Sequence, residues 1–185
     1  MQNKKDINKD AKTSFNSKSP AYKAAFIGLF SAFAIIISYI ESLIPINIGI
    51  PGIKPGFANI VIIIVLYAMN IKSAAMINLI RITIIGIMFG NVLSISFSCA
   101  GAVLSMFVMV WIKKIKGVSM IGASVCGGVA HNLGQIAAAA TITTVYSLLY
   151  YIPFLIIGGI ITGIIVGIAA DIIYTRVIKR LEDFS

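Results

Sequence analysis

The sequence predicts an all-α fold, a polytopic membrane protein built as a bundle of six transmembrane helices. Composition is the first observation: 59% of the 185 residues are hydrophobic and 11% are charged, whereas soluble domains are about half apolar and about a quarter charged. The second is a mean hydropathy of +1.00. The third is that the apolar segments are apolar on every side, so they offer no polar face to water. Lipid is therefore the solvent that suits them.

The chain divides into three predicted parts. Residues 1–20 are polar, basic and without apolar periodicity, which predicts a disordered cytoplasmic tail. Residues 21–178 form the six-helix transmembrane domain, and residues 179–185 form a short cytoplasmic C-terminus. A cleaved signal peptide is not expected, because the first apolar segment is too long and lacks a small-residue cleavage site.

Six segments are long enough, or nearly so, to cross the membrane as helices, which takes about 20 residues. They are residues 22–43, 57–71, 73–89, 92–112, 118–146 and 151–174. The connection IPINIGIPGIKPG after the first span is rich in proline and glycine, so it cannot be regular helix. The second span is short and begins close after Pro55. Pro153 lies near the first turn of the sixth, where a missing N–H costs nothing.

The basic residues predict the topology. With the N-terminus in the cytoplasm, the cytoplasmic gaps hold Lys4, Lys5, Lys9, Lys12, Lys18, Lys23, Lys72, Lys113, Lys114, Lys116, Arg176, Lys179 and Arg180. Only Lys54 falls outside, and Arg81 lies within a span. Since loops rich in Lys and Arg stay in the cytoplasm, both ends are predicted to be cytoplasmic. Charges confined to short gaps do not form a nucleic-acid groove, so the expected partner is the lipid bilayer and not nucleic acid.

No metal or cofactor is expected. Cys99 and Cys126 lie inside apolar segments, with no CxxC pair and no histidine at metal-ligand spacing. Both are predicted to be buried thiols, which behave as small core residues. His131 is the single histidine of the chain, so a histidine metal site is excluded.

Small residues recur every four positions on one face of two spans, at Ala24, Gly28 and Ala32 and at Gly159, Gly163 and Gly167. Such faces let helix backbones approach closely in lipid. Packing between helices of this chain explains both. For the first span, docking of another membrane subunit is the alternative, because the face continues toward the cytoplasmic end.

Arg81 is a charged residue near the mid-depth of the third span, about nine residues past Lys72. An arginine there costs about 2.5 to 3.5 kcal/mol on insertion scales, so it should face the bundle interior or a wet cavity. Glu41 and Asp171 are the candidate partners within the chain. The alternative is that Arg81 contacts an anionic group of a ligand that enters from outside. Asn78, one turn earlier on the same face, suits either role.

The fifth span carries the densest polar cluster, GGVAHNLGQ. His131, Asn132 and Gln135 project from adjoining stripes of one helix, and the glycines beside them leave room. This pattern is typical of a polar pocket wall between helices. Hydrogen bonds between helices, worth about 1 kcal/mol each in membranes, are the alternative.

The outer connection is the third polar feature, since Glu41, Lys54 and Asn59 lie in or beside the PGIKPG turn. Proline rigidity and glycine freedom suit a lid or gate over a site. A plain connector has the same composition, so both interpretations stay open.

Three stretches carry a resemblance to a known family: ESLIPINIGIPGIKPGFANI, the pairs RI at Arg81 and FG at Phe89, and AHNLGQ ending at Gln135. Together they resemble the bacterial Gx transporter family, whose members are also labelled heptaprenyl diphosphate synthase component I, over residues 22–171. The six-span architecture is also similar to that of the substrate-binding S components of energy-coupling factor transporters.

The resemblance implies a module of the bacterial cytoplasmic membrane that binds a small solute from outside. It also implies a membrane scaffold and ATPase subunits as partners. No Walker A motif is present, so any ATP hydrolysis must be done by another chain. The implied site consists of Glu41, Lys54, Asn59, Arg81, His131, Asn132 and Gln135. The implied docking face consists of Ala24, Gly28 and Ala32.

The synthase label implies a different function, a noncatalytic membrane subunit in isoprenoid or quinone metabolism. Diphosphate ionisation needs clustered carboxylates that hold Mg²⁺, and the six acidic residues of this chain form no DDxxD motif. The chain is therefore not expected to be an enzyme. A structural scaffold for an electron-transfer or export complex is the third hypothesis.

Overall fold

The computed structural model describes residues 19–43, 56–115 and 117–182, and within them the fold is all-helical. Its elements are α2 (Pro20–Leu43), α3 (Asn59–Ala68), α4 (Ile71–Phe89), α5 (Val92–Lys114), α6 (Met120–Thr143), the 3₁₀ helix η1 (Tyr146–Tyr151) and α7 (Ile152–Glu182). The six α-helices match the six expected segments in order, which confirms the fold class. Of the predicted tail, residues 1–18 lie outside the described residues, as does Lys54, whereas Pro20 already begins α2.

Four helical stretches in the described ranges are long and apolar enough to cross a membrane. They are α2, α4, α5 and the stretch Tyr146–Arg176, which contains most of α7. The chain is therefore a membrane protein, because helices of this length and composition have lipid as their natural surroundings. α6 has 24 residues and is more polar, since it carries the cluster predicted to line a pocket.

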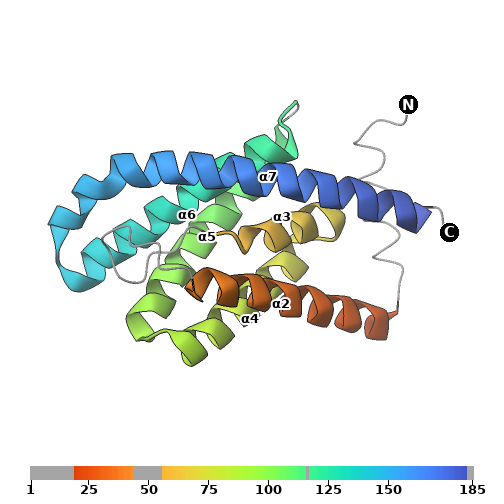
Figure 1. Ribbon diagram of the computed structural model, residues 1–185, viewed down its shortest axis with the longest axis horizontal. Coiled ribbons are helices and arrows are strands. Elements are labelled where there is room, and N and C mark those ends of the chain that lie inside the picture. Colours follow the sequence, from red (N-terminus) through yellow and green to blue (C-terminus); the bar gives the residue numbers. More distant parts are fainter. Residues whose placement is uncertain (1–18, 44–55, 116, 183–185) are drawn as a thin grey trace.

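α3 is shorter than the predicted second span. It has 10 residues, or about 15 Å of helix. The chain turns at Gly56, whose φ of +87° favours glycine, and the side chain of Asn70 already caps α4 by accepting from the N–H of Ser73 at 2.8 Å. α3 is almost entirely buried and packs against α2, α4, α6 and α7, so it is a core helix of the bundle (Figure 1).

α5, α6 and α7 form the most closely packed part of the structure, with the most extensive contacts between neighbouring helices. A Cβ on Gly163 of α7 would lie 2.6 Å from the Cα of Val125 in α6, and one on Gly134 of α6 would lie 2.8 Å from the Cα of Gly101 in α5. Backbones this close require glycine. The prediction of internal packing is confirmed for the sixth span.

α2 and α4 run side by side along the other side of the molecule (Figure 1).

The face of α2 formed by Ala24, Gly28 and Ala32 is exposed, and a Cβ on Gly28 would meet nothing within 4 Å. Internal packing among the described residues therefore does not account for these small residues. The cysteines differ from expectation too: Cys99 and Cys126 are free thiols of intermediate burial and not core residues.

Candidate functional site

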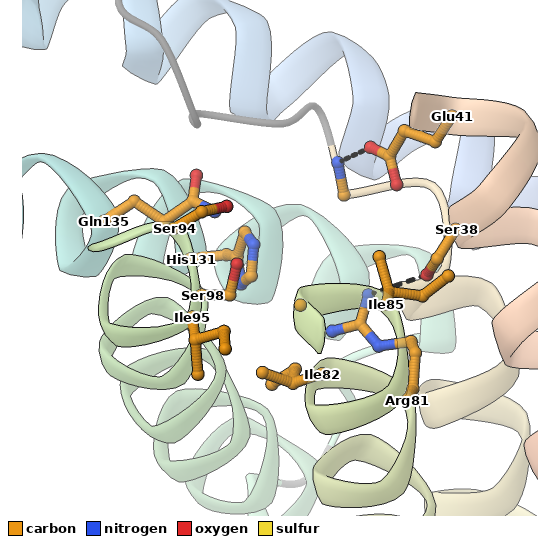
Figure 2. Close-up of a pocket in the computed structure, with 12 residues that line it drawn as sticks. Ser38, Glu41, Arg81, Ile82, Ile85, Ser94, Ile95, Ser98, His131 and Gln135 are labelled. Atoms are coloured by element: carbon orange, nitrogen blue, oxygen red, sulfur yellow. Dashed lines mark hydrogen bonds between the residues drawn. The ribbon is translucent and has the colours of Figure 1, made fainter. Parts of the chain in front are cut away.

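A polar cavity lies where α2, α4, α5 and α6 meet (Figure 2). Its polar lining consists of Ser38 and Glu41 of α2, Arg81 of α4, Ser94 and Ser98 of α5, and His131 and Gln135 of α6. Its volume is about 30 Å³, and a single water needs about 10 to 15 Å³. The cavity therefore has room for about two waters.

Arg81 is 7% exposed and faces this cavity from α4. Its Nε and Nη2 donate to Oδ1 of Asn78 at 3.2 and 2.6 Å, and its Nη1 donates to Oγ of Ser38 at 3.3 Å. Both partners are neutral, so these bonds orient the guanidinium without cancelling its charge. A guanidinium carries more N–H groups than these bonds use. Arg81 thus keeps positive charge and donor capacity for the cavity.

Glu41 comes from the outer end of α2 and is 5% exposed. Its Oε1 accepts from the backbone N–H groups of Gly56 and Phe57, which ties α2 to the turn before α3. It attracts Arg81 electrostatically, although within the described residues no direct ion pair joins the two side chains. Of the two acidic candidates, Glu41 is the one that lines the cavity; Asp171 does not.

The spacing of its buried residues explains why α2 presents polar side chains to the cavity. Its buried residues are Ser31, Ala34, Ser38 and Glu41, and these spacings of three and four place them on one helix face. Several larger apolar residues of α2, among them Phe33 and Ile36, are exposed, as suits contact with lipid, and others, among them Phe30 and Ile37, pack against the core. The fully buried positions of α2 are therefore small or polar.

His131 and Gln135 line the opposite wall from consecutive turns of α6 and are 2% and 1% exposed. Among the described residues, Nδ1 of His131 and Oε1 of Gln135 have no hydrogen-bond partner. An unsatisfied buried polar group costs about 1 to 3 kcal/mol. Gly101 of α5 leaves the space beside them, since a Cβ there would lie 2.7 Å from Cγ of Gln135. These two atoms of the wall can therefore form hydrogen bonds with a ligand or a water.

The structure thus brings together four of the seven predicted site residues: Glu41, Arg81, His131 and Gln135. Asn132 does not join them, because one residue along a helix turns the side chain by about 100°; its Nδ2 donates to the backbone O of Leu155 in α7 at 2.9 Å.

Asn59 lines a second, smaller cavity of about 10 Å³ with Ser124 and Thr162. Gly56 lies between the two cavities and lines both. Lys54, the last of the seven predicted residues, belongs to the stretch that the structure does not describe.

Three serines of the cavity were not among the predicted site residues. Ser38 lies three residues before Glu41, so its place on the same helix face was available from spacing. Ser94 and Ser98 carry no such signal, because small polar residues are common where membrane helices pack. Within the described ranges, no group of three or more His, Cys, Asp or Glu residues is placed to hold a metal ion.

A comparison with protein families finds a match to the family described as heptaprenyl diphosphate synthase component I, over residues 30–173. The matched region runs from the middle of α2 into α7 and includes every residue that lines the polar cavity. No curated protein and no solved structure matches the chain.

Proposed function

The chain belongs to the heptaprenyl diphosphate synthase component I family, and we propose that it is a membrane-embedded binding and transport component for a small polar or anionic organic solute. One observation carries the proposal: Arg81, His131 and Gln135 face a single buried cavity with hydrogen-bonding capacity that the described residues do not use. Buried polar groups in proteins are normally satisfied. A bound solute would satisfy these.

The charges in the cavity favour one class of solute. Arg81 presents a positive charge held by neutral partners, and the carboxylate of Glu41 is already engaged by two backbone N–H groups. The available interactions are therefore donors from Arg81 and an acceptor on Gln135. A solute with a carboxylate or phosphate group and a nearby N–H or O–H matches them, since arginine forks bind such anions.

Bound small molecules in the purified protein test this proposal. We expect the full-length protein, extracted from its native membrane in mild detergent, to carry a solute that mass spectrometry identifies. Arg81→Gln should lower its affinity by about 30-fold or more, because loss of a buried charged partner costs at least about 2 kcal/mol. Gln135→Leu removes the unpartnered amide without removing a charge, so it should weaken binding in a fully folded protein.

Arg176→Gln is the matched control, because Arg176 is an exposed basic residue of α7 far along the chain from the cavity. It should retain the solute at the wild-type level. Retention of solute by both Arg81→Gln and Gln135→Leu would exclude the cavity as the binding site.

We also propose the bacterial cytoplasmic membrane as the location, with both termini in the cytoplasm. A green fluorescent protein fused after Ser185 should then fluoresce, because it folds in the cytoplasm. The same reporter fused after Gly90, between α4 and α5, should be dark, whereas alkaline phosphatase at that position should be active. The reverse pattern would show the opposite orientation.

The family description favours a second candidate, a noncatalytic membrane subunit of a prenyl diphosphate synthase. Its partner would be a soluble synthase, whereas the transport hypothesis calls for a membrane scaffold and ATPase subunits. In either case, the exposed small-residue face of α2, at Ala24, Gly28 and Ala32, is the proposed docking surface. Recovery of a soluble synthase with the wild-type protein, without any solute, would favour the second candidate.

A further inference from the structure

A large apolar groove runs between α4 and α5, with a volume of about 530 Å³. Its floor contains the buried residues Asn78, Ile82 and Ala102. Its rim is formed by exposed apolar side chains, among them Phe107, which is 69% exposed, and Trp111, which is 63% exposed. The groove therefore opens toward the surroundings of the helices, which for a membrane protein are lipid.

The groove is closed at one end and open at the other. At the closed end α4 and α5 touch, because a Cβ on Gly86 would collide with the side chain of Ile95. From Ile71 at the open end to Ile82 is eleven residues of α4, or about 16 Å, and from Cys99 to Lys114 is fifteen residues of α5, or about 22 Å. These lengths are about half to three quarters of the roughly 30 Å hydrocarbon core. The groove thus covers the depth of one leaflet, and it is too short for a helix that spans the bilayer.

The open end of the groove is positively charged. Lys114 lines it from the end of α5. Lys72 follows Ile71 at the start of α4 and is exposed at the same end, although it does not itself line the groove. Lys113 points elsewhere, since its Nζ donates to the backbone O of Leu66 at 2.7 Å and lies over the ring of Tyr67. No acidic side chain is among the described residues that line the groove. The charge at this end therefore suits an anion.

We propose that this groove binds an anionic phospholipid, with one acyl chain lying between α4 and α5 and the headgroup phosphate at Lys72 and Lys114. Leaflet depth, an apolar floor and a basic end are the three properties that such a lipid requires. Trp111 at the charged end has the position that tryptophan favours at membrane interfaces. The inference does not depend on the polar cavity, although Ile82 lines both hollows.

Trp111 provides the test, because it is the single tryptophan of the chain and lies on the groove. The full-length protein is reconstituted in phosphatidylcholine vesicles that contain brominated phosphatidylglycerol or, in parallel, brominated phosphatidylcholine, and quenching of Trp111 fluorescence is measured. The expected result is preferential quenching by the anionic lipid. Each lysine should contribute about fivefold to the preference, the equivalent of about 1 kcal/mol.

Substitutions then locate the lipid. Lys72→Gln combined with Lys114→Gln should reduce the preference to about one, whereas Arg176→Gln on α7 should leave it unchanged. Ala75→Phe, which fills the groove, should reduce quenching by either lipid, and Ala137→Phe on exposed α6 surface should not. Equal quenching of the wild-type protein by the two lipids would overturn the proposal. Protection of Trp111 from both lipids would also overturn it, because a protein would then cover the groove.

Discussion

Gly163→Val should lower the melting temperature of the detergent-solubilised protein by about 10 °C. Its Cβ would lie 2.6 Å from the Cα of Val125 and 3.0 Å from the backbone O of Ser124. Backbone atoms cannot move aside, so α6 and α7 would have to separate. Overpacking of this kind costs about 3 kcal/mol, and a chain of this size loses about 2 to 4 °C per kcal/mol. Thermal unfolding followed by size-exclusion chromatography measures the shift.

Gly158→Val is the matched control for this prediction, because it makes the same chemical change in the same helix. A Cβ on Gly158 would meet nothing within 4 Å. Its melting temperature should therefore stay within about 2 °C of the wild type, since surface substitutions change stability by about 0.5 kcal/mol or less. Equal losses at Gly158 and Gly163 would show that close packing of α6 on α7 does not hold these helices together.

Glu41→Gln should lower the melting temperature by about 5 °C, and adding Arg81→Met should recover part of the loss. The amide of glutamine still offers a carbonyl oxygen to the N–H groups of Gly56 and Phe57, so the single substitution removes only the charge. Arg81 then loses the attraction of the nearby carboxylate. Because the two side chains form no direct ion pair among the described residues, this should cost about 1 to 3 kcal/mol. The double variant holds neither charge. We expect a coupling of about 1 to 3 kcal/mol in the double-mutant cycle.

Ser38→Ala separates this charge effect from simple loss of a hydrogen bond. It removes the acceptor of the Nη1 bond of Arg81 and should cost about 1 kcal/mol, without a change of charge. Additive losses for Glu41→Gln and Arg81→Met would contradict the prediction, because they would mean that the two charges do not stabilise each other.

Hydropathy was enough to predict the order and number of the α-helices, because an apolar run in lipid has few alternatives to a helix. The length of α3 was not predictable. Its start depends on the turn at Gly56, which is held by Glu41 from 15 residues away in the chain, and its end depends on the cap at Asn70. The proline- and glycine-rich connection marks the turn at Gly56, but hydropathy does not mark the exact boundaries, because Gly56 and Asn70 both lie beside apolar sequence.

The candidate site was predictable where a residue is costly in lipid. Arg81, His131 and Gln135 are such residues, since a charge or large polar group must face the interior of the bundle. The choice of Glu41 over Asp171 needed the tertiary structure. Asn132 was predicted in the site because it lies three residues before Gln135, on an adjoining stripe of the helix, but its side chain turns toward α7 and donates to the backbone O of Leu155. Residue spacing alone does not show which of two adjoining helix stripes faces the cavity.

Because of the glycine contacts among α5, α6 and α7, the two walls of the polar cavity differ in how easily they can move. The wall that carries His131 and Gln135 belongs to a stiff body, because its helices touch backbone to backbone. The wall that carries Ser38, Glu41 and Arg81 belongs to α2 and α4, which have less extensive contacts with that body. Local opening is easiest where few contacts must break. Under the proposed function, a solute larger than two waters would therefore enter by displacing the wall formed by α2 and α4, and the wall that carries His131 and Gln135 would keep its shape and select the solute.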